Sequence, residues 1–245
     1  MIRAILKNKI FLKVLNKINF FIKDLKNVEI KEVNVDGNIL ILAPHADDES
    51  IGCAGIMLNY FNKVNVICIT DGRYGDPEIE PNKMIEIRQN EFKNAMNFLK
   101  VSSYVFLSIE DSKVSENYKK FTEIDFNKYK AIFIPNYLDR HLDHKAVSNH
   151  IYKLIKQNYI SKNTDIYYYE VWNTVPVVNS YIDISKKVND KKNIINFYKS
   201  QIKHINYTDK IIALNKFRGL SLELDYAECY MKLSATEFIN FMDSK

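Results

Sequence analysis

The chain alternates between short, continuously apolar segments and longer segments in which apolar residues recur at helical spacing. The short segments predict buried strands, because a strand covered on both faces has no polar side to show. The longer segments predict amphipathic helices between them. Strands are expected over 38–43, 64–70, 104–109, 131–135, 165–172, 181–184 and 226–233, and helices over 49–61, 82–100, 146–157, 187–202 and 211–220.

This repeated strand–helix–strand order predicts an α/β fold of Rossmann-like type. Strands joined by helical crossovers run parallel, and right-handed crossovers place helices on both faces of a mainly parallel sheet. Only 6 Gly and 5 Pro occur among 245 residues, so few flexible linkers are expected. We therefore assign residues 36–245 to a single domain.

Residues 1–30 form a separate segment, predicted to be an amphipathic and basic helix. Seven Lys or Arg stand against one acid, Asp24, in residues 1–26, and apolar residues follow helical spacing from Phe11 to Leu25. Three arrangements stay open. The helix packs on the body, lies on an anionic membrane surface, or forms a homo-oligomer contact.

Composition narrows the class of protein. The chain is 47% hydrophobic and 27% charged, as in globular proteins. Because the first 26 residues supply the net positive charge, the body is near neutral and no nucleic-acid partner is expected. Cys53, Cys68 and Cys229 lie in apolar surroundings and are expected to be reduced. With no clear signal segment, this predicts a cytoplasmic protein, with the inner face of the membrane as an alternative location.

Acidic residues and histidines gather directly after two of the predicted strands. The strand 38–43 runs into His45, Asp47 and Asp48, and the strand 131–135 is followed by DRHLDH at 139–144. Ligands of parallel sheets bind at the carboxyl ends of strands, so these clusters are expected to meet. Burying several carboxylates is unfavourable without a cation. Two histidines and one carboxylate, with a position left for water, are the ligands of catalytic zinc sites.

Local structural roles compete with this interpretation. Asp47 or Asp48 could cap the helix predicted from residue 49, and Asp143 could cap the helix that begins near His144. The spacing also does not distinguish which of His141 and His144 would be the metal ligand.

The two clusters resemble the signature motifs of the LmbE/PIG-L zinc-dependent N-deacetylases. APHADDE (43–49) is similar to the AHPDDE-type motif of this family, and DRHLDH (139–144) to its HxDH-type motif. Later blocks also resemble the family, and the likeness covers most of the chain except the N-terminal segment. These blocks are TDGRYGD (70–76), EIRQNEFKNAMNFLKV (86–101), YEVW (169–172), YKSQ (198–201), RG (218–219) and YAE (226–228).

The resemblance implies one Zn²⁺ per chain, bound by His45, Asp48 and His144. It implies that Asp47 is the general base that takes a proton from the attacking water.

It also implies that His141 polarises the substrate carbonyl or stabilises the oxyanion, and that Asp143 holds His141 in orientation. Arg88 and Arg140 are candidate substrate contacts. The alternative for Arg88 is an exposed helix ion pair with Glu86 or Glu91, and for Arg140 it is a surface position.

The activity implied is hydrolytic removal of an acetyl group from an N-acetylglucosamine-type conjugate, either a small molecule or a lipid-linked sugar. Acetate and a free amine would be released. Two alternatives stay open: a zinc amidase for another N-acyl compound, such as a thiol conjugate, an acylated peptide or an antibiotic precursor, and a non-catalytic sugar-binding module. Tyr74, Tyr137 and Trp172 could stack on a sugar or have ordinary packing roles.

Overall fold

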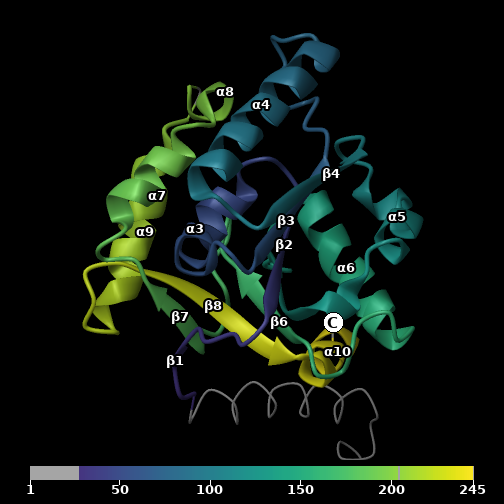
Figure 1. Cartoon of the computed structure of the whole chain (residues 1–245), viewed down its shortest axis with the longest axis vertical. Helices are drawn as coiled ribbons and strands as arrows, with labels where there is room; N and C mark the ends of the chain where they lie inside the picture. Colours follow the sequence, from purple (N-terminus) through teal and green to yellow (C-terminus); the bar gives the residue numbers. More distant parts are fainter. Residues whose placement is uncertain (1–27, 204, 245) are drawn as a thin grey trace, which may run out of the picture.

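The computed structural model describes residues 28–203 and 205–244, and the helix predicted over residues 1–26 lies outside them. The described part holds one eight-stranded sheet in the order β1-β7-β8-β6-β5-β2-β3-β4 (Figure 1). Neighbouring strands are parallel, except that β8 is antiparallel to both β6 and β7. The predicted fold, a mainly parallel Rossmann-like sheet in a single domain, is confirmed.

The strand bounds follow the apolar segments closely, and two strands match the predicted ranges without change. The strands are β1 (Lys31–Glu32), β2 (Asn38–Ala43), β3 (Val64–Thr70), β4 (Ser103–Ile109), β5 (Tyr129–Pro135), β6 (Asp165–Tyr169), β7 (Ser180–Asp183) and β8 (Ala227–Ser234).

The helices differ more from the prediction. The helix predicted over 187–202 is two helices, α7 and α8, and neither α5 nor α10 was predicted. The helices are α3 (Asp48–Tyr60), α4 (Pro81–Leu99), α5 (Tyr118–Thr122), α6 (Leu142–Lys156), α7 (Val188–Ile195), α8 (Lys199–Ile202), α9 (Tyr207–Leu220) and α10 (Ala235–Asp243), with short 3₁₀ turns η1 (Val114–Glu116) and η2 (Phe126–Lys128).

Helices cover both faces of the sheet (Figure 1). Helices α3, α4, α7 and α9 lie on one face, and α5, α6 and α10 on the other. In β2, Ile39 and Ile41 point to the first layer, whereas Leu40 and Leu42 point to the second. All four are fully buried. Each such side chain contributes about 1.5–3 kcal/mol relative to an exposed one, so this strand is anchored from both sides.

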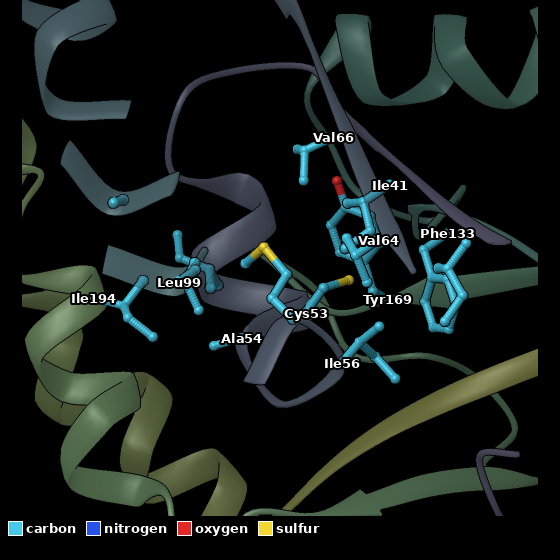
Figure 2. Packing of buried hydrophobic residues seen from close by; sticks show 14 of the residues in the cluster. Ile41, Cys53, Ala54, Ile56, Val64, Val66, Leu99, Phe133, Tyr169 and Ile194 are labelled. Atoms are coloured by element: carbon cyan, nitrogen blue, oxygen red, sulfur yellow. The ribbon is translucent and has the colours of Figure 1, made fainter. Parts of the chain in front are cut away.

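The first core fixes the position of α3, the helix that follows β2. Figure 2 shows Cys53 of this helix near Tyr169 of β6, and Ala54 belongs to the same core. The Tyr169 hydroxyl donates a 2.9 Å hydrogen bond to the Leu42 carbonyl. A Cβ at Gly52 would lie 2.3 Å from the Tyr169 ring, so only glycine permits this approach. The start of α3 is therefore held firmly at the end of β2.

The described part of the chain also bears on the cysteines and on membrane-spanning helices. Cys53, Cys68 and Cys229 are buried and free. None of the helices within residues 28–203 and 205–244 is long and apolar enough to cross a membrane.

Candidate metal centre and active-site cleft

The loop after β2 brings three of the predicted site residues together. The His45 backbone N–H donates to Asp48 Oδ2 at 2.8 Å, which closes a tight turn between strand and helix. Asp47 occupies the N-cap position of α3 with φ 151° and ψ −24°. A non-glycine residue in such a conformation costs about 1–3 kcal/mol, and strain of this kind persists where the surroundings enforce it. The side chains of all three residues line one cleft.

The loop after β5 brings the second cluster to the same place. His141 is the N-cap of α6, and its Nδ1 accepts a 3.3 Å hydrogen bond from the Asp143 backbone N–H. His144, one turn further, is fully buried. The ring centroid of His45 lies 4.5 Å from that of His141 and 5.5 Å from that of His144. The two sequence clusters therefore form one site, as predicted.

Asp48 joins the two histidines that the family resemblance selects as ligands. Its Oδ2 lies 3.3 Å from His45 Nδ1 and 3.2 Å from His144 Nε2. Donor atoms bound at about 2.1 Å to one tetrahedral zinc ion lie about 3.4 Å apart. The distances from Asp48 to the two histidines therefore fit a shared zinc ion.

Other donor sets lie nearby. His45, His141 and His144 each place one ring nitrogen within 4.8 Å of the others. His45 does the same with Asp111 and Asp143. The short contacts of Asp48 with two imidazoles favour Asp48 as the ligand carboxylate.

Three further carboxylates lie against the ring nitrogens of His45 and His144. Asp139 Oδ2 lies 3.2 Å from His144 Nδ1. Asp111 Oδ1 and Asp143 Oδ2 lie 3.3 Å and 3.4 Å from His45 Nε2. Carboxylates in these positions fix the orientation of an imidazole and raise its basicity as a metal ligand. Asp143 is held in turn, because its oxygens accept the Ser112 and Val114 backbone N–H groups at 2.9 and 3.2 Å.

Asp47 is clamped through both carboxylate oxygens. Arg88 Nη2 donates to Oδ1 at 3.1 Å, and the Tyr207 hydroxyl donates to Oδ2 at 2.9 Å. Burial raises the pKa of Asp47 above its usual value, although the Arg88 charge opposes this shift. A carboxylate with a raised pKa that stays beside a cation is suited to accept and return a proton.

The pKa shifts of the three histidines differ in direction. Burial opposes protonation of His144, but the Asp48 carboxylate outweighs it and raises the pKa to about 9. Burial likewise opposes protonation of His45, yet Asp111, Asp143 and Asp48 raise its pKa well above the usual value. For His141, burial and the neighbouring imidazoles both lower the pKa. His141 is therefore uncharged at neutral pH.

These groups line a cleft whose water-accessible space is about 160 Å³. Its lining combines catalytic candidates with glycines and exposed aromatic rings: His45, Asp47, Asp48, Gly72, Tyr74, Gly75, Arg88, Asp111, His141, Trp172 and Gln201.

The structure resolves several alternatives that the sequence left open. Arg88 is 3% exposed and bonded to Asp47, so it is not an exposed helix partner of Glu86 or Glu91. Neither Asp47 nor Asp143 caps a helix through its side chain. Arg140 is exposed and is not among the cleft-lining residues, in contrast to Arg88.

Three residues of the site were not assigned a role from the sequence. Asp139 lies within a recognised motif, and Asp111 follows the predicted strand 104–109, so strand-end position was an available signal for both. Tyr207 is 160 residues from Asp47 along the chain. No local pattern links these two positions.

A mainly parallel sheet with a buried histidine–carboxylate cluster at its carboxyl edge is the arrangement of an α/β enzyme with a candidate metal site. Residues 40–155, which include both clusters, match the family model described as PIG-L, GlcNAc-PI de-N-acetylase. The chain therefore contains a PIG-L (LmbE-like) domain, the domain of a family of N-deacetylase enzymes, and the resemblance seen in the sequence is confirmed.

Solved structures share the fold. N,N′-diacetylchitobiose deacetylase from Pyrococcus horikoshii is 20% identical with a TM-score of 0.71, over 82% of this chain and 85% of that chain. A zinc-inhibited form of teicoplanin deacetylase is 13% identical with a TM-score of 0.60, over 80% and 97% of the two chains.

The fold also carries a different reaction. 4-Carboxy-2-hydroxymuconate hydratase from Pseudomonas putida is 14% identical with a TM-score of 0.62, over 81% of this chain and 96% of that chain. The reaction must therefore be argued from the site rather than from the fold.

Proposed function

We propose that the chain hydrolyses the N-acetyl group of an amino-sugar conjugate of the N-acetylglucosamine type, with zinc held by His45, Asp48 and His144. The observation that carries this proposal is the approach of Asp48 Oδ2 to one nitrogen of each histidine, at 3.3 and 3.2 Å. The family description, GlcNAc-PI de-N-acetylase, and the diacetylchitobiose deacetylase structure support an amino-sugar substrate.

Zinc, when bound, supplies a Lewis acid for the amide carbonyl and acidifies water at neutral pH. Asp47 accepts the proton of the attacking water, since Arg88 and Tyr207 fix its two oxygens at the cleft. His141 stabilises the oxyanion. Its Nδ1 accepts the Asp143 N–H, which leaves the proton of the neutral ring on Nε2 as the donor. The C–N bond then breaks, Asp47 returns the proton to the leaving nitrogen, and acetate and the amine are released.

A panel of acetylated compounds tests the proposal. The purified protein, loaded with zinc or with another divalent ion, is given N-acetylglucosamine, N,N′-diacetylchitobiose, UDP-N-acetylglucosamine and the non-sugar compound N-acetylcysteine. Several ions are needed because a related teicoplanin deacetylase has a zinc-inhibited form. We expect acetate release from at least one sugar, with loss of one acetyl group by mass spectrometry. Release from N-acetylcysteine alone would favour a general amidase, and release from none would contradict the proposal.

We also propose where the enzyme acts and how it assembles. An intracellular amino-sugar precursor would place the enzyme in the cytoplasm. Residues 1–26 would then bring it to a membrane surface or to a second copy. Co-sedimentation with anionic vesicles, with and without residues 1–26, distinguishes these two roles.

A further inference from the structure

Trp172 stands at the mouth of the cleft with much of its ring in water. It is the only Trp of the sequence, its exposed fraction is 53%, and it lines the cleft. Aromatic rings normally gain stability by burying their large apolar surface. A Trp left half exposed at an active-site mouth gains nothing from this surface until a ligand covers it.

Two contacts hold Trp172 in place despite its exposure. Its backbone N–H donates to Asp139 Oδ2 at 3.1 Å. Its ring packs edge-on against Tyr207, with the ring centroids 5.7 Å apart. A ring that is already oriented loses little conformational freedom when a ligand stacks on it. Trp172 is therefore a preformed binding surface rather than a loose surface residue.

The cleft has a polar floor and an aromatic rim. The floor holds His45, Asp47 and Asp48, which are 9% exposed or less. At the rim, Tyr74 is 55% exposed, and its hydroxyl donates to Glu110 at 3.3 Å. A substrate whose acetamide reaches the floor therefore shares the cleft with the exposed rings of Trp172 and Tyr74.

A pyranose ring has the chemistry that such a cleft binds. Its C–H groups form an apolar face that packs on an aromatic ring, and its hydroxyls extend from the edge toward polar groups. Asp111 and Gln201 line the same cleft and can bond these hydroxyls. An open-chain N-acyl amine offers no flat apolar face of this size.

We propose that Trp172 is the platform on which a sugar ring of the substrate stacks, so that the cleft selects ring-bearing N-acetyl compounds over open-chain ones. This inference rests on the proposed function and assigns the residue that determines its specificity. Trp172 acts on binding. Its ring contact is with Tyr207, and it is neither a proposed metal ligand nor the proposed base.

Intrinsic fluorescence tests the platform directly, because all Trp emission comes from this residue. The titration uses the full chain carrying Asp47→Asn, which slows turnover, and the sugars N-acetylglucosamine, N,N′-diacetylchitobiose and UDP-N-acetylglucosamine. We expect a saturable change in emission and reduced acrylamide quenching with at least one sugar. N-acetylcysteine at equal concentration should change neither.

Kinetics of the active protein give a second readout. Trp172→Ala should raise KM for the sugar substrate about 10-fold and leave kcat within about 3-fold, whereas Trp172→Phe should keep most of the affinity. Phe217→Ala is the matched control, because Phe217 is an aromatic residue of α9 that is 67% exposed and lines a different hollow. It should change neither constant.

The outcomes separate the two proposals. Sugar deacetylation with unchanged emission at saturation, or with an unchanged KM in Trp172→Ala, would overturn the platform and leave the proposed function standing. A loss of kcat alone in Trp172→Ala would also overturn it, because that result assigns the residue to support of Asp139 or Tyr207. If the protein deacetylated no sugar and no sugar changed its emission, both proposals would be overturned.

Discussion

Two groups of buried charges lie around α3, and they differ in how well they are satisfied. Lys191 of α7 donates to Glu228 at 2.8 Å and to the Ile51 carbonyl at 2.7 Å. Glu228 also accepts the Gly55 N–H at 2.9 Å and the Tyr230 hydroxyl at 2.6 Å. One cation and one anion are balanced there, and their main donors and acceptors are used.

The cluster at the end of β2 is not balanced in this way. Five buried carboxylates lie around His45 and His144: Asp47, Asp48, Asp111, Asp139 and Asp143. Arg88 forms an ion pair with one of them, Asp47. Two Arg88 nitrogens have no hydrogen-bond partner among the described residues, and the His144 ring nitrogens face the Asp48 and Asp139 carboxylates at 3.2 Å. Buried polar groups are normally satisfied, so the first group serves the fold, whereas the second has the excess of carboxylates expected of a candidate metal site.

The contrast predicts that Asp47→Asn damages catalysis far more than stability. The amide cannot accept a proton, so kcat for the best sugar of the panel should fall about 10²–10⁴-fold. Metal content should stay at the wild-type level, since Asp47 is not a proposed ligand. Assays of acetate release measure kcat, and elemental analysis measures the metal content. The control is Asp125→Asn, the same change at an exposed surface pair. Near-normal kcat in Asp47→Asn would require another base.

Lys191→Met should show the opposite behaviour. It leaves the Glu228 charge buried without its partner, which costs about 3–5 kcal/mol of unfolding free energy. Urea denaturation measures this loss. The affinity for zinc of the folded fraction should stay unchanged. Lys128→Met, at a side chain that is 65% exposed, is the control and should cost less than about 1 kcal/mol. If Lys191→Met and Lys128→Met lowered the unfolding free energy equally, the buried pair of Lys191 and Glu228 would not have the structural role assigned to it.

A smaller effect is expected from His150, a buried histidine outside the site. Its Nε2 donates to the Val114 carbonyl at 2.8 Å, and burial lowers its pKa. The folded state therefore binds fewer protons than the unfolded state. This residue's contribution is complete above its unfolded pKa of about 6.5 and is lost as the pH falls below that value.

His150→Gln should flatten this dependence, because glutamine stays neutral. Between pH 7 and pH 5, the unfolding free energy of the variant should fall less than that of the wild type. The limit on the difference is about 1.4 kcal/mol per pH unit. Parallel curves for the two proteins would show that His150 does not titrate on unfolding.

The sequence was most informative where one local signal decided the structure. The apolar segment 64–70 became β3 with unchanged bounds. The capping signal of Ser234 and Glu237 at the start of α10 was also present, as the structure shows both of its hydrogen bonds, but the prediction did not use it.

Other features depend on contacts between distant residues. The predicted helix over 187–202 is interrupted at Tyr198, whose backbone leaves the helical region at ψ 56° while its buried hydroxyl bonds Glu49. In the same way, the antiparallel direction of β8 and the bond of Tyr207 to Asp47 follow from the assembled fold. The metal-site candidates were predictable because strand ends converge. The clamp on Asp47 was not.

The central claim is that His45, Asp48 and His144 hold one zinc ion, and metal content in the presence of a chelator tests it most directly. Wild-type protein and His144→Ala are dialysed against the same moderate concentration of chelator and analysed by mass spectrometry for zinc per chain, with His150→Gln as the histidine control. The account predicts about one zinc in the wild type and in His150→Gln, and almost none in His144→Ala. Full occupancy in His144→Ala would contradict it.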